Sequence, residues 1–224
     1  MSMPSHNEDD YLKTIYYLTE GGSPARTQDI AGRLGVKPPS VTEMLQKLSE
    51  KDLLEYRPYY GARLTERGVR RAKKITRKHR IFETFLGSIV GVTPEQAHQQ
   101  ACDMEHSLSD EAEQTLCKMM GKPSVCTDDE QPIPGCDIEC DVCLKKDSVR
   151  PLSELDEDSS AIISHVYTTD RAQMRKLVSM GFIPDRRIRL IEVAPMGGPF
   201  IVDIGDGVVA IGREFAENIF VEEA

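Results

Sequence analysis

The sequence lacks the features of a membrane-spanning or secreted protein. No window of the 224 residues approaches the run of about 18 apolar residues that a membrane span needs. Its first residues, MSMPSHNEDDYLK, have neither the basic segment nor the apolar segment of a secretion signal. We therefore expect a cytoplasmic protein, whose six cysteines are thiols or metal ligands rather than disulfides.

The motifs of nucleotide-binding enzymes and serine hydrolases are also missing. The chain contains no Walker A sequence, no GxGxxG, no GxSxG and no internal repeat, which leaves little support for either class. An apolar content of 39% is enough for packed cores. The length allows one large domain or two to three small ones.

The net charge of -9 argues at first against a nucleic-acid partner, but the charge is unevenly distributed. Residues 1–80 carry 16 Lys and Arg against 10 Asp and Glu, whereas residues 81–147 carry 4 against 14 and residues 148–224 carry 8 against 13. A basic first third followed by an acidic middle indicates a module that binds a polyanion, joined to a part that collects cations.

The basic third has the spacing of a helix-turn-helix. DDYLKTIYYLTEGG predicts a first helix, because its apolar residues recur on one face and paired glycines end it. IAGRLG then predicts a short helix that ends at Gly35, and a second helix begins at Pro38–Pro39. Runs at 54–57 and 62–64, separated by PYYG, predict a two-stranded wing.

The exposed face of this second helix predicts DNA binding. Its polar side chains can reach base edges and phosphates. The alternative is a helix-turn-helix that only forms part of a protein core. The candidate DNA-binding residues are Ser40, Thr42, Glu43, Gln46 and Lys47.

Two later helices carry potential metal ligands. Thr65 can cap a long helix that carries His79 and Glu83 four residues apart. Thr93–Pro94 opens the next helix, on which His98, Cys102, Glu105 and His106 fall within an arc of about 100°. Nitrogen, sulfur and oxygen donors on one face suit a transition-metal ion. The alternative is an amphipathic helix with a core cysteine and solvated His and Glu side chains.

The remainder of the chain divides by composition. Residues 121–149 are rich in Pro, Gly, Asp and Cys and predict a linker. The runs AIISHVY, RIRLIEVA, FIVDI and VVAIG then predict strands of a small β-barrel, with a helix at DRAQMRKLVSMG and a hairpin around Gly-Asp-Gly.

Taken together, these pieces resemble the diphtheria-toxin-repressor family of metal-dependent transcriptional repressors over the whole chain. The resemblance is carried by YLKTIYYL, IAGRLGVKPPSVTEMLQKL, RKHRIFE and AHQQACDMEHSLSDEAE. The C-terminal part looks like the SH3-like domain of the family's iron-sensing branch, and RKLVSMGFIPDRRIRLIEVAPMGGPF is similar to the small ferrous-iron-transport protein A. The resemblance implies a homodimer that binds a palindromic operator.

The resemblance also implies two ligand sets in each subunit. The regulatory site comprises Asp10, Cys102, Glu105 and His106, and the ancillary site comprises His79, Glu83, His98, Asp170 and Gln173. Asp10 stands where the iron sensors have Met, Cys102 where the manganese sensors have a carboxylate, and Asp170 where a Glu is usual. The family's DNA-facing positions fall on Lys37, Pro39, Ser40 and Glu43, of which Lys37 and Glu43 replace neutral polar residues, so the operator sequence is not transferable.

The resulting prediction is a multidomain chain, mainly α and then β. It consists of a winged helix-turn-helix domain at 1–74, a helical dimerisation and metal-binding domain at 75–120, a linker at 121–149 and an SH3-like domain at 150–224. Without metal, Asp10, Glu105 and an ionised Cys102 repel one another, so that a divalent ion fastens the first helix to the dimer core. This would set the spacing of the two reading helices at about 34 Å.

The expected cofactor is Fe(II), with Mn(II) as the alternative and Zn(II), Co(II) or Ni(II) as substitutes in vitro. The Cys102 thiolate favours Fe(II), while Asp10 and Glu105 suit harder ions. A further set of cysteines, spaced C-x9-C-x3-C-x2-C, could hold zinc or an iron-sulfur cluster, or could simply be reduced thiols in a linker. These are Cys126, Cys136, Cys140 and Cys143.

Two other functions compete with the repressor. One is a metalloenzyme that activates a water molecule with the His/Glu/Cys cluster, although no uncommitted general base is apparent. The other makes the C-terminal barrel an interaction module associated with an iron transporter, with transcription secondary.

Overall fold

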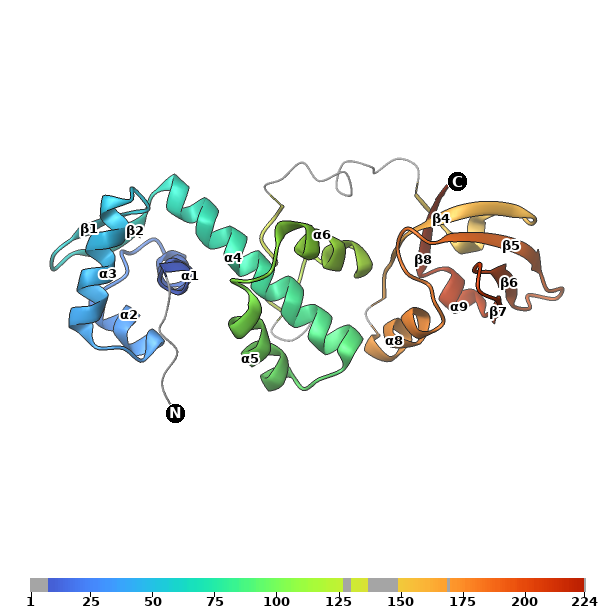
Figure 1. The fold of residues 1–224 in the computed structure, drawn as a ribbon, viewed down its shortest axis with the longest axis horizontal. Coiled ribbons are helices and arrows are strands. Elements are labelled where there is room, and N and C mark those ends of the chain that lie inside the picture. The colour runs from blue at the N-terminus through green and yellow to red at the C-terminus, as the bar shows by residue number, and fades with distance from the viewer. Residues whose placement is uncertain (1–7, 127–129, 137–148, 169, 224) are drawn as a thin grey trace. The chain divides into compact units, whose positions relative to one another are not determined.

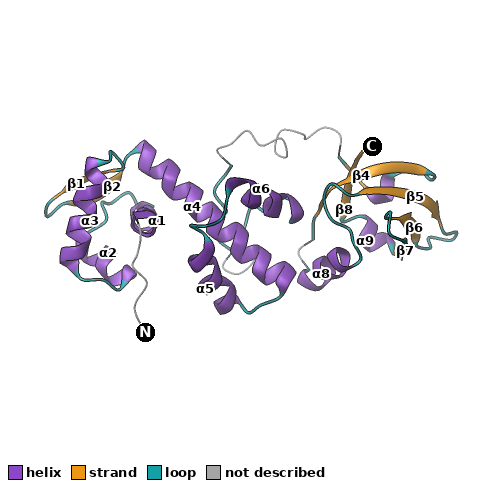
Figure 2. Ribbon diagram, in the orientation of Figure 1, coloured by secondary structure: helices purple, strands orange, loops and turns teal. Residues whose placement is uncertain are grey.

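The computed structural model describes residues 8–126, 130–136, 149–168 and 170–223 (Figure 1). The chain forms two compact units, and the boundary between them falls inside one long helix, between Lys78 and His79. Helices predominate in the first part of the chain and strands in the last, as the sequence predicts (Figure 2). Among the described residues, none of the helices has the length and apolar character that a bilayer crossing requires.

The first unit begins with three helices, α1 (Glu8–Thr19), α2 (Thr27–Leu34) and α3 (Pro38–Glu50). Gly35 ends α2 with a φ of 65°, a left-handed conformation that glycine adopts without strain, so the chain can turn sharply into α3. One side of each helix is buried in a common core, which confirms the predicted helix-turn-helix. Its fully buried members include Leu12, Ile15, Ile30, Val41, Leu45 and Leu48.

A two-stranded wing, β1 (Leu54–Arg57) and β2 (Gly61–Leu64), follows α3 as predicted. The wing is joined to the segment before α2 by reciprocal hydrogen bonds between Ala25 and Ala62, each 2.9 Å long. Gly61 permits this approach, because a Cβ atom there would lie 2.6 Å from the carbonyl oxygen of Ala25. The base of the hairpin is therefore fixed to the body of the unit.

Helix α4 (Glu66–Phe85) begins where Thr65 accepts a hydrogen bond from the backbone of Gly68, the predicted cap. It continues into a π-helical turn, η1 (Leu86–Val90). Helix α5 (Pro94–Met104) starts with a capping box of Thr93 and Gln96, and α6 (Asp110–Met119) is capped by Ser109. The three helices pack around Phe82, Leu86, Ala97 and Ala101.

The segment after α6 packs onto these helices instead of running free. Cys126 and Ile133 are buried in one cluster with Ile81, Cys117 and Met120. Val125 and Pro132 form an isolated β-bridge, and the backbone of Cys126 donates a 2.9 Å hydrogen bond to Gln131. Cys126 and Ile133 of the predicted linker therefore pack against the helices, and this places a thiol in the helical core.

The C-terminal part forms a six-stranded antiparallel sheet in the order β3-β8-β4-β5-β6-β7. Its strands are β3 (Arg150–Pro151), β4 (Ser159–Val166), β5 (Arg187–Val193), β6 (Phe200–Asp203), β7 (Val208–Ile211) and β8 (Ile219–Glu223). Helices α8 (Arg171–Ser179) and α9 (Arg213–Ala216) and the short η2 (Leu152–Glu154) complete this part. Its core includes Leu177 of α8, Phe182 and Phe200. The sequence analysis did not predict β3 and β8, which flank the other strands on one side.

Candidate metal centre

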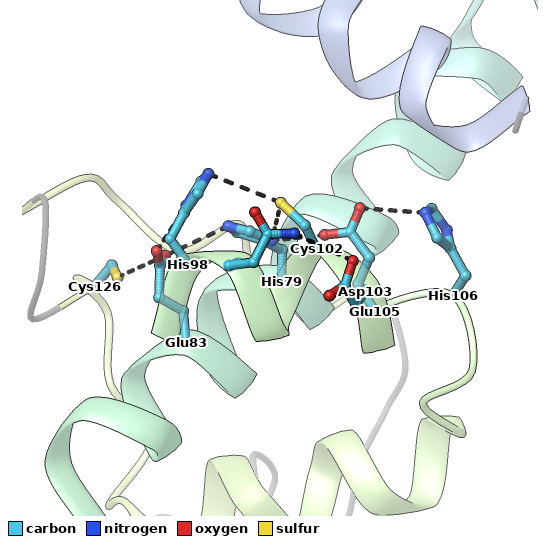
Figure 3. A network of polar contacts seen from close by, with 9 residues as sticks. His79, Glu83, His98, Cys102, Asp103, Glu105, His106 and Cys126 are labelled. Carbon is cyan, nitrogen blue, oxygen red and sulfur yellow. Dashed lines mark hydrogen bonds and ion pairs between the residues drawn. The ribbon is translucent and has the colours of Figure 1, made fainter. Parts of the chain in front are cut away.

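Helices α4 and α5 bring four potential metal ligands together (Figure 3). His79 and Glu83 lie one turn apart on α4, and His98 and Cys102 lie one turn apart on α5. Side chains four residues apart share a helix face, so each helix presents a pair. Because α4 and α5 share an apolar cluster, the two pairs meet.

His79, His98 and Cys102 form the tightest group of nitrogen and sulfur donors. Their ligand atoms all lie within 4.8 Å of one another. The Cys102 sulfur is 3.8 Å from Nε2 of His98 and 3.9 Å from Nδ1 of His79. In a tetrahedral site, a sulfur and a nitrogen bound to the same ion are about 3.5 Å apart. The observed separations are therefore close to those of a bound set.

The carboxylate of Glu83 connects several of these groups. Oε1 of Glu83 is 2.9 Å from Nδ1 of His98, and Oε2 is 3.5 Å from Nε2 of His79. Oε2 also accepts a hydrogen bond from the thiol of Cys126 at 3.4 Å. Since Glu83 is buried, these side chains rather than bulk water surround its carboxylate.

Glu105 is the second buried carboxylate, with 0% of its surface exposed. Its Oε2 lies 2.6 Å from Nδ1 of His79, and its Oε1 lies 3.5 Å from Nε2 of His106. Helix α5 ends at Met104, so Glu105 is its C-cap and His106 lies in the turn that follows. The prediction that one helix extends through His106 was wrong at this end, because the chain turns here with Ser107 bonded to Met104.

These residues fit a divalent transition metal. Imidazole nitrogens, one thiolate and carboxylate oxygens form a mixed set that suits borderline ions such as Fe(II), Co(II), Ni(II) and Zn(II). The two buried carboxylates, Glu83 and Glu105, would also supply negative charge to balance a divalent cation. His79, Glu83, His98, Cys102 and Glu105 are the residues that would hold it.

The predicted DNA-binding residues lie on α3 and just before it, in the first unit. Thr42 is half-buried and donates its hydroxyl to the carbonyl of Pro38 at 3.2 Å, and Nζ of Lys47 lies 3.0 Å from the carboxylate of Glu8. The remaining candidates are exposed: Lys37, Pro39, Ser40, Glu43 and Gln46. The face of α3 is therefore open to a partner, while the charge of Lys47 is partly offset by Glu8.

Comparison with known proteins identifies the family. Family models match in chain order: the iron-dependent repressor N-terminal DNA-binding domain at residues 3–62, its metal-binding and dimerisation domain at 65–135, and the FeoA domain at 150–223. The iron-dependent repressor IdeR of Mycobacterium tuberculosis is 31% identical over 223 residues, which cover 95% of each chain. The chain belongs to the iron-dependent repressor family.

Other relatives match part or nearly all of this chain. The HTH-type transcriptional regulator MntR of Listeria monocytogenes is 41% identical over 107 residues, which cover 48% of this chain and 75% of that one. The crystal structure of T. acidophilum IdeR aligns over 98% of this chain and 99% of that chain, with a TM-score of 0.52 and 27% identity. The predicted fold class and resemblance are confirmed. The family is one of metal-dependent transcriptional repressors, not of enzymes, and it includes a dimerisation domain.

In this repressor, the predicted regulatory and ancillary ligands are in contact with one another. Cys102 lies beside His98 and His79, and Glu105 also contacts His79, although the resemblance assigns these residues to different sites. Asp10 lies in the first turn of α1, next to Glu8 and Asp9. The division of the ligands into two sites remains a prediction.

The other predicted ancillary ligands have partners within the C-terminal part. The carboxylate of Asp170 caps α8 by accepting hydrogen bonds from the backbone of Ala172 and Gln173. The side-chain oxygen of Gln173 accepts from Thr168 at 2.5 Å and from Asn218 at 3.2 Å. The structure does not bring either residue into the cluster of donors around His79.

Of the four linker cysteines, Cys140 and Cys143 lie outside the described residues. Cys136 is half-buried. Cys126 is fully buried beside Glu83, so its thiol belongs to the surroundings of the candidate centre. Sequence spacing could not indicate this contact, because the two residues are 43 positions apart. A separate zinc or iron-sulfur site on the four cysteines remains a prediction, which the metal content of a Cys140→Ser, Cys143→Ser variant would test.

Proposed function

We propose that this protein represses transcription as a homodimer that binds a palindromic operator when Fe(II) occupies the candidate metal centre. The convergence of His79, His98 and Cys102 within 4.8 Å carries the proposal. The likeness to IdeR, an iron-dependent repressor by its name, supports it.

The proposal keeps the two ligand sets. His79, Glu83 and His98 form the ancillary set, with Asp170 and Gln173 as its C-terminal members. Asp10, Cys102, Glu105 and His106 form the regulatory set. The short distances from Cys102 to His98 and from Glu105 to His79 imply that the sets are adjacent, so that occupation of one influences the other.

Asp10 gives the centre its influence on DNA binding. When bound, the metal supplies positive charge that offsets the carboxylates and the thiolate. Asp10 belongs to α1, whose apolar face shares a core with α3. Engagement of Asp10 by the regulatory set therefore restrains the reading helix along with α1, and a dimer needs its two reading helices about 34 Å apart. A change from mostly free to mostly bound operator requires several kcal/mol of preference for the competent state.

The choice of Fe(II) rests on the Cys102 thiolate. Sulfur ligands favour Fe(II), Co(II) or Ni(II) over Mn(II). Because affinity alone would favour Zn(II), the availability of each metal in the cell also determines which ion is bound. A Mn(II)-responsive repressor is the second candidate. The carboxylates Asp10 and Glu105 favour it, because harder ions prefer oxygen ligands.

Binding of DNA at controlled metal activity tests the proposal. A duplex selected from a random-sequence pool by the metal-loaded protein serves as the probe, and fluorescence anisotropy is measured anaerobically with Fe(II), Mn(II), Zn(II) or a chelator. We expect Fe(II) to lower the Kd by at least about tenfold, which corresponds to about 1.4 kcal/mol. Equal affinity in chelator and in metal would disprove metal control.

A matched pair of histidine variants tests whether the response of DNA binding to metal depends on the cluster around His79. His79→Ala removes a central donor of the cluster and should abolish the response to metal. His165→Phe changes a histidine in β4, outside the cluster, and should leave the response intact. Loss of the response in both variants would show that the assay reports stability instead of metal binding.

A further inference from the structure

A cavity lies where the end of α4, the segment after α6 and the C-terminal part of the chain meet. Helix α8 contacts η1, the continuation of α4, and Nζ of Lys118 in α6 lies 2.5 Å from the carboxylate of Asp185. These contacts belong to the second compact unit. The cavity has a volume of about 380 Å³, which is at the lower end of the range for small-molecule sites. Its size suits a small metabolite.

The floor of the cavity, formed by its buried lining residues, contains an unpartnered hydroxyl. Thr84 of α4 is 2% exposed, and its Oγ1 has no hydrogen-bond partner in the part of the chain that the structure describes. By contrast, the hydroxyls of Thr19 and Thr115 donate to the carbonyl four residues earlier in their helices. Buried polar groups nearly always have a partner, so the hydroxyl of Thr84 indicates a group that a bound molecule would supply.

The rest of the floor consists of sulfur-containing side chains from three segments. Met120 follows α6, Cys126 lies in the loop after it, and Met174 belongs to α8, and all three are buried. The thiol of Cys126 already donates to Glu83. Methionine side chains adapt their shape to what they contact. The floor therefore accepts a short apolar chain that ends in a polar group, next to Thr84.

The mouth of the cavity, formed by its more exposed lining residues, carries charges of opposite sign. Arg171, the first residue of α8, is half-buried, and Glu130 is exposed. A guanidinium binds a carboxylate through paired hydrogen bonds, and a carboxylate accepts hydrogen bonds from an ammonium group. A ligand with both charges close together satisfies both residues, whereas an inorganic anion would be repelled by Glu130.

We propose that this cavity binds a free α-amino acid with an uncharged polar side chain, of about the size of glutamine. The α-carboxylate of the ligand pairs with Arg171 and its ammonium group with Glu130. Its side chain enters the floor, and the polar end bonds to Oγ1 of Thr84. The proposal goes beyond the function proposed above, and binding of the amino acid needs neither metal nor DNA.

Calorimetric titration and thermal unfolding of the full-length, metal-free protein test the proposal. A ligand that binds only the folded chain raises the Tm. The probes are L-glutamine, L-leucine, which lacks the polar end, and glutaramate, which lacks the α-ammonium group. We expect glutamine to raise the Tm and to have a Kd at least about tenfold lower than either analogue, because each analogue loses hydrogen bonds of the site. Equal binding of all three, or no shift with about 10 mM glutamine, would overturn the proposal.

Two threonine variants assign binding to the cavity. Thr76 belongs to the same helix but to the first compact unit, and its Oγ1 is also buried without a partner among the described residues. Thr84→Val and Thr76→Val each replace an unpartnered hydroxyl by a methyl group, so neither should lower the Tm of the ligand-free protein. Only Thr84→Val should weaken glutamine binding, by about two- to tenfold. Unchanged affinity in Thr84→Val, or equal losses in both variants, would show that glutamine does not contact Thr84.

A variant at the mouth tests the charged contact. Arg171→Met keeps an unbranched side chain but removes the guanidinium, and we expect it to weaken glutamine binding by at least about tenfold. Arg175→Met, an exposed position one turn further along α8, should bind as the wild type does. Metal-dependent DNA binding by a wild-type protein that does not bind glutamine would refute the cavity proposal and leave the repressor proposal intact. Glutamine binding without metal-dependent DNA binding would have the opposite meaning.

Discussion

The imidazole of His79 and the carboxylate of Glu105 form a buried pair, with Nδ1 and Oε2 separated by 2.6 Å. His79 is 5% exposed and Glu105 is fully buried. A carboxylate so far from water needs a close partner, and His79 provides it. Loss of His79 would remove this close partner while Glu105 stays buried, so the contact matters to the metal-free protein as well as to the candidate centre.

Removal of His79 should destabilise the metal-free protein. His79→Ala leaves the carboxylate of Glu105 with weaker partners, and we expect the free energy of unfolding to fall by about 2–4 kcal/mol. Urea unfolding in the presence of a chelator measures this change without any contribution from metal.

His106→Ala is the matched control for His79→Ala. The His106 side chain is 23% exposed and its ring nitrogen lies 3.5 Å from the same carboxylate, so a loss of less than about 1 kcal/mol is expected. Equal losses in the two variants would mean that Glu105 does not depend on His79.

Replacement of the thiol at position 102 should change the preference for metals. Cys102→Glu exchanges a soft sulfur for a hard oxygen, so activation of DNA binding by Mn(II) should improve relative to Fe(II) by about tenfold. Asp10→Met should act in the opposite direction. Metal titrations of DNA binding under anaerobic conditions measure both shifts.

Cys117→Ala serves as the control for Cys102→Glu. Cys117 is a buried cysteine of α6 that is not among the predicted ligands, so its replacement should leave the order of metals unchanged. If Cys102→Glu retained the wild-type order, Cys102 would not be a ligand that selects the metal.

The sequence predicts which ligand residues share a helix face, but it does not predict that the two faces contact each other. Helical spacing alone indicates that His79 and Glu83 share one face and that His98 and Cys102 share another. Their contact requires α4 to pack against α5, and the resemblance to a family supplied that expectation. Cys126 shows the limit of such reasoning, because its approach to Glu83 depends on a loop conformation held by contacts between distant residues.

The ends of helices and the strands β3 and β8 were harder to predict. The residues around Glu105 and His106 keep a helical pattern of side chains, but the backbone turns after Met104. Only Glu217 and Asn218 separate the short helix α9 from strand β8, so the sequence has no longer turn segment that would indicate the start of the strand. Asp170 resembles a ligand by position, yet its carboxylate caps α8, a local role that the sequence DRAQ also allows.

Relief of backbone strain at the wing tip should stabilise the protein. Tyr59 lies in the turn between β1 and β2 with a φ of 67°. Asn tolerates a positive φ better than Tyr does, so Tyr59→Asn should raise the free energy of unfolding by about 0.5–1 kcal/mol. Thermal unfolding of the metal-free protein measures the gain. Met196→Asn should give a similar gain, since Met196 has a φ of 62°. Loss of stability in Tyr59→Asn would show that the ring makes a stabilising contact.

His165 should make stability depend on pH. Its ring stacks on Phe220 with centroids 4.7 Å apart, and partial burial together with Lys122 and Lys118 lowers the pKa of His165 to about 4 from 6.5. Between these values the unfolded chain binds more protons than the folded one, so stability falls as the pH decreases from about 6.5 to 4. His165→Phe keeps a ring in the stack but cannot titrate. The loss of stability between pH 7 and pH 4.5 should therefore be smaller in this variant by about 1 kcal/mol, after allowance for partial exposure. Urea unfolding at the two pH values in chelator provides the measurement. Identical pH dependence in the two proteins would show that His165 is protonated as readily in the folded chain as in the unfolded one.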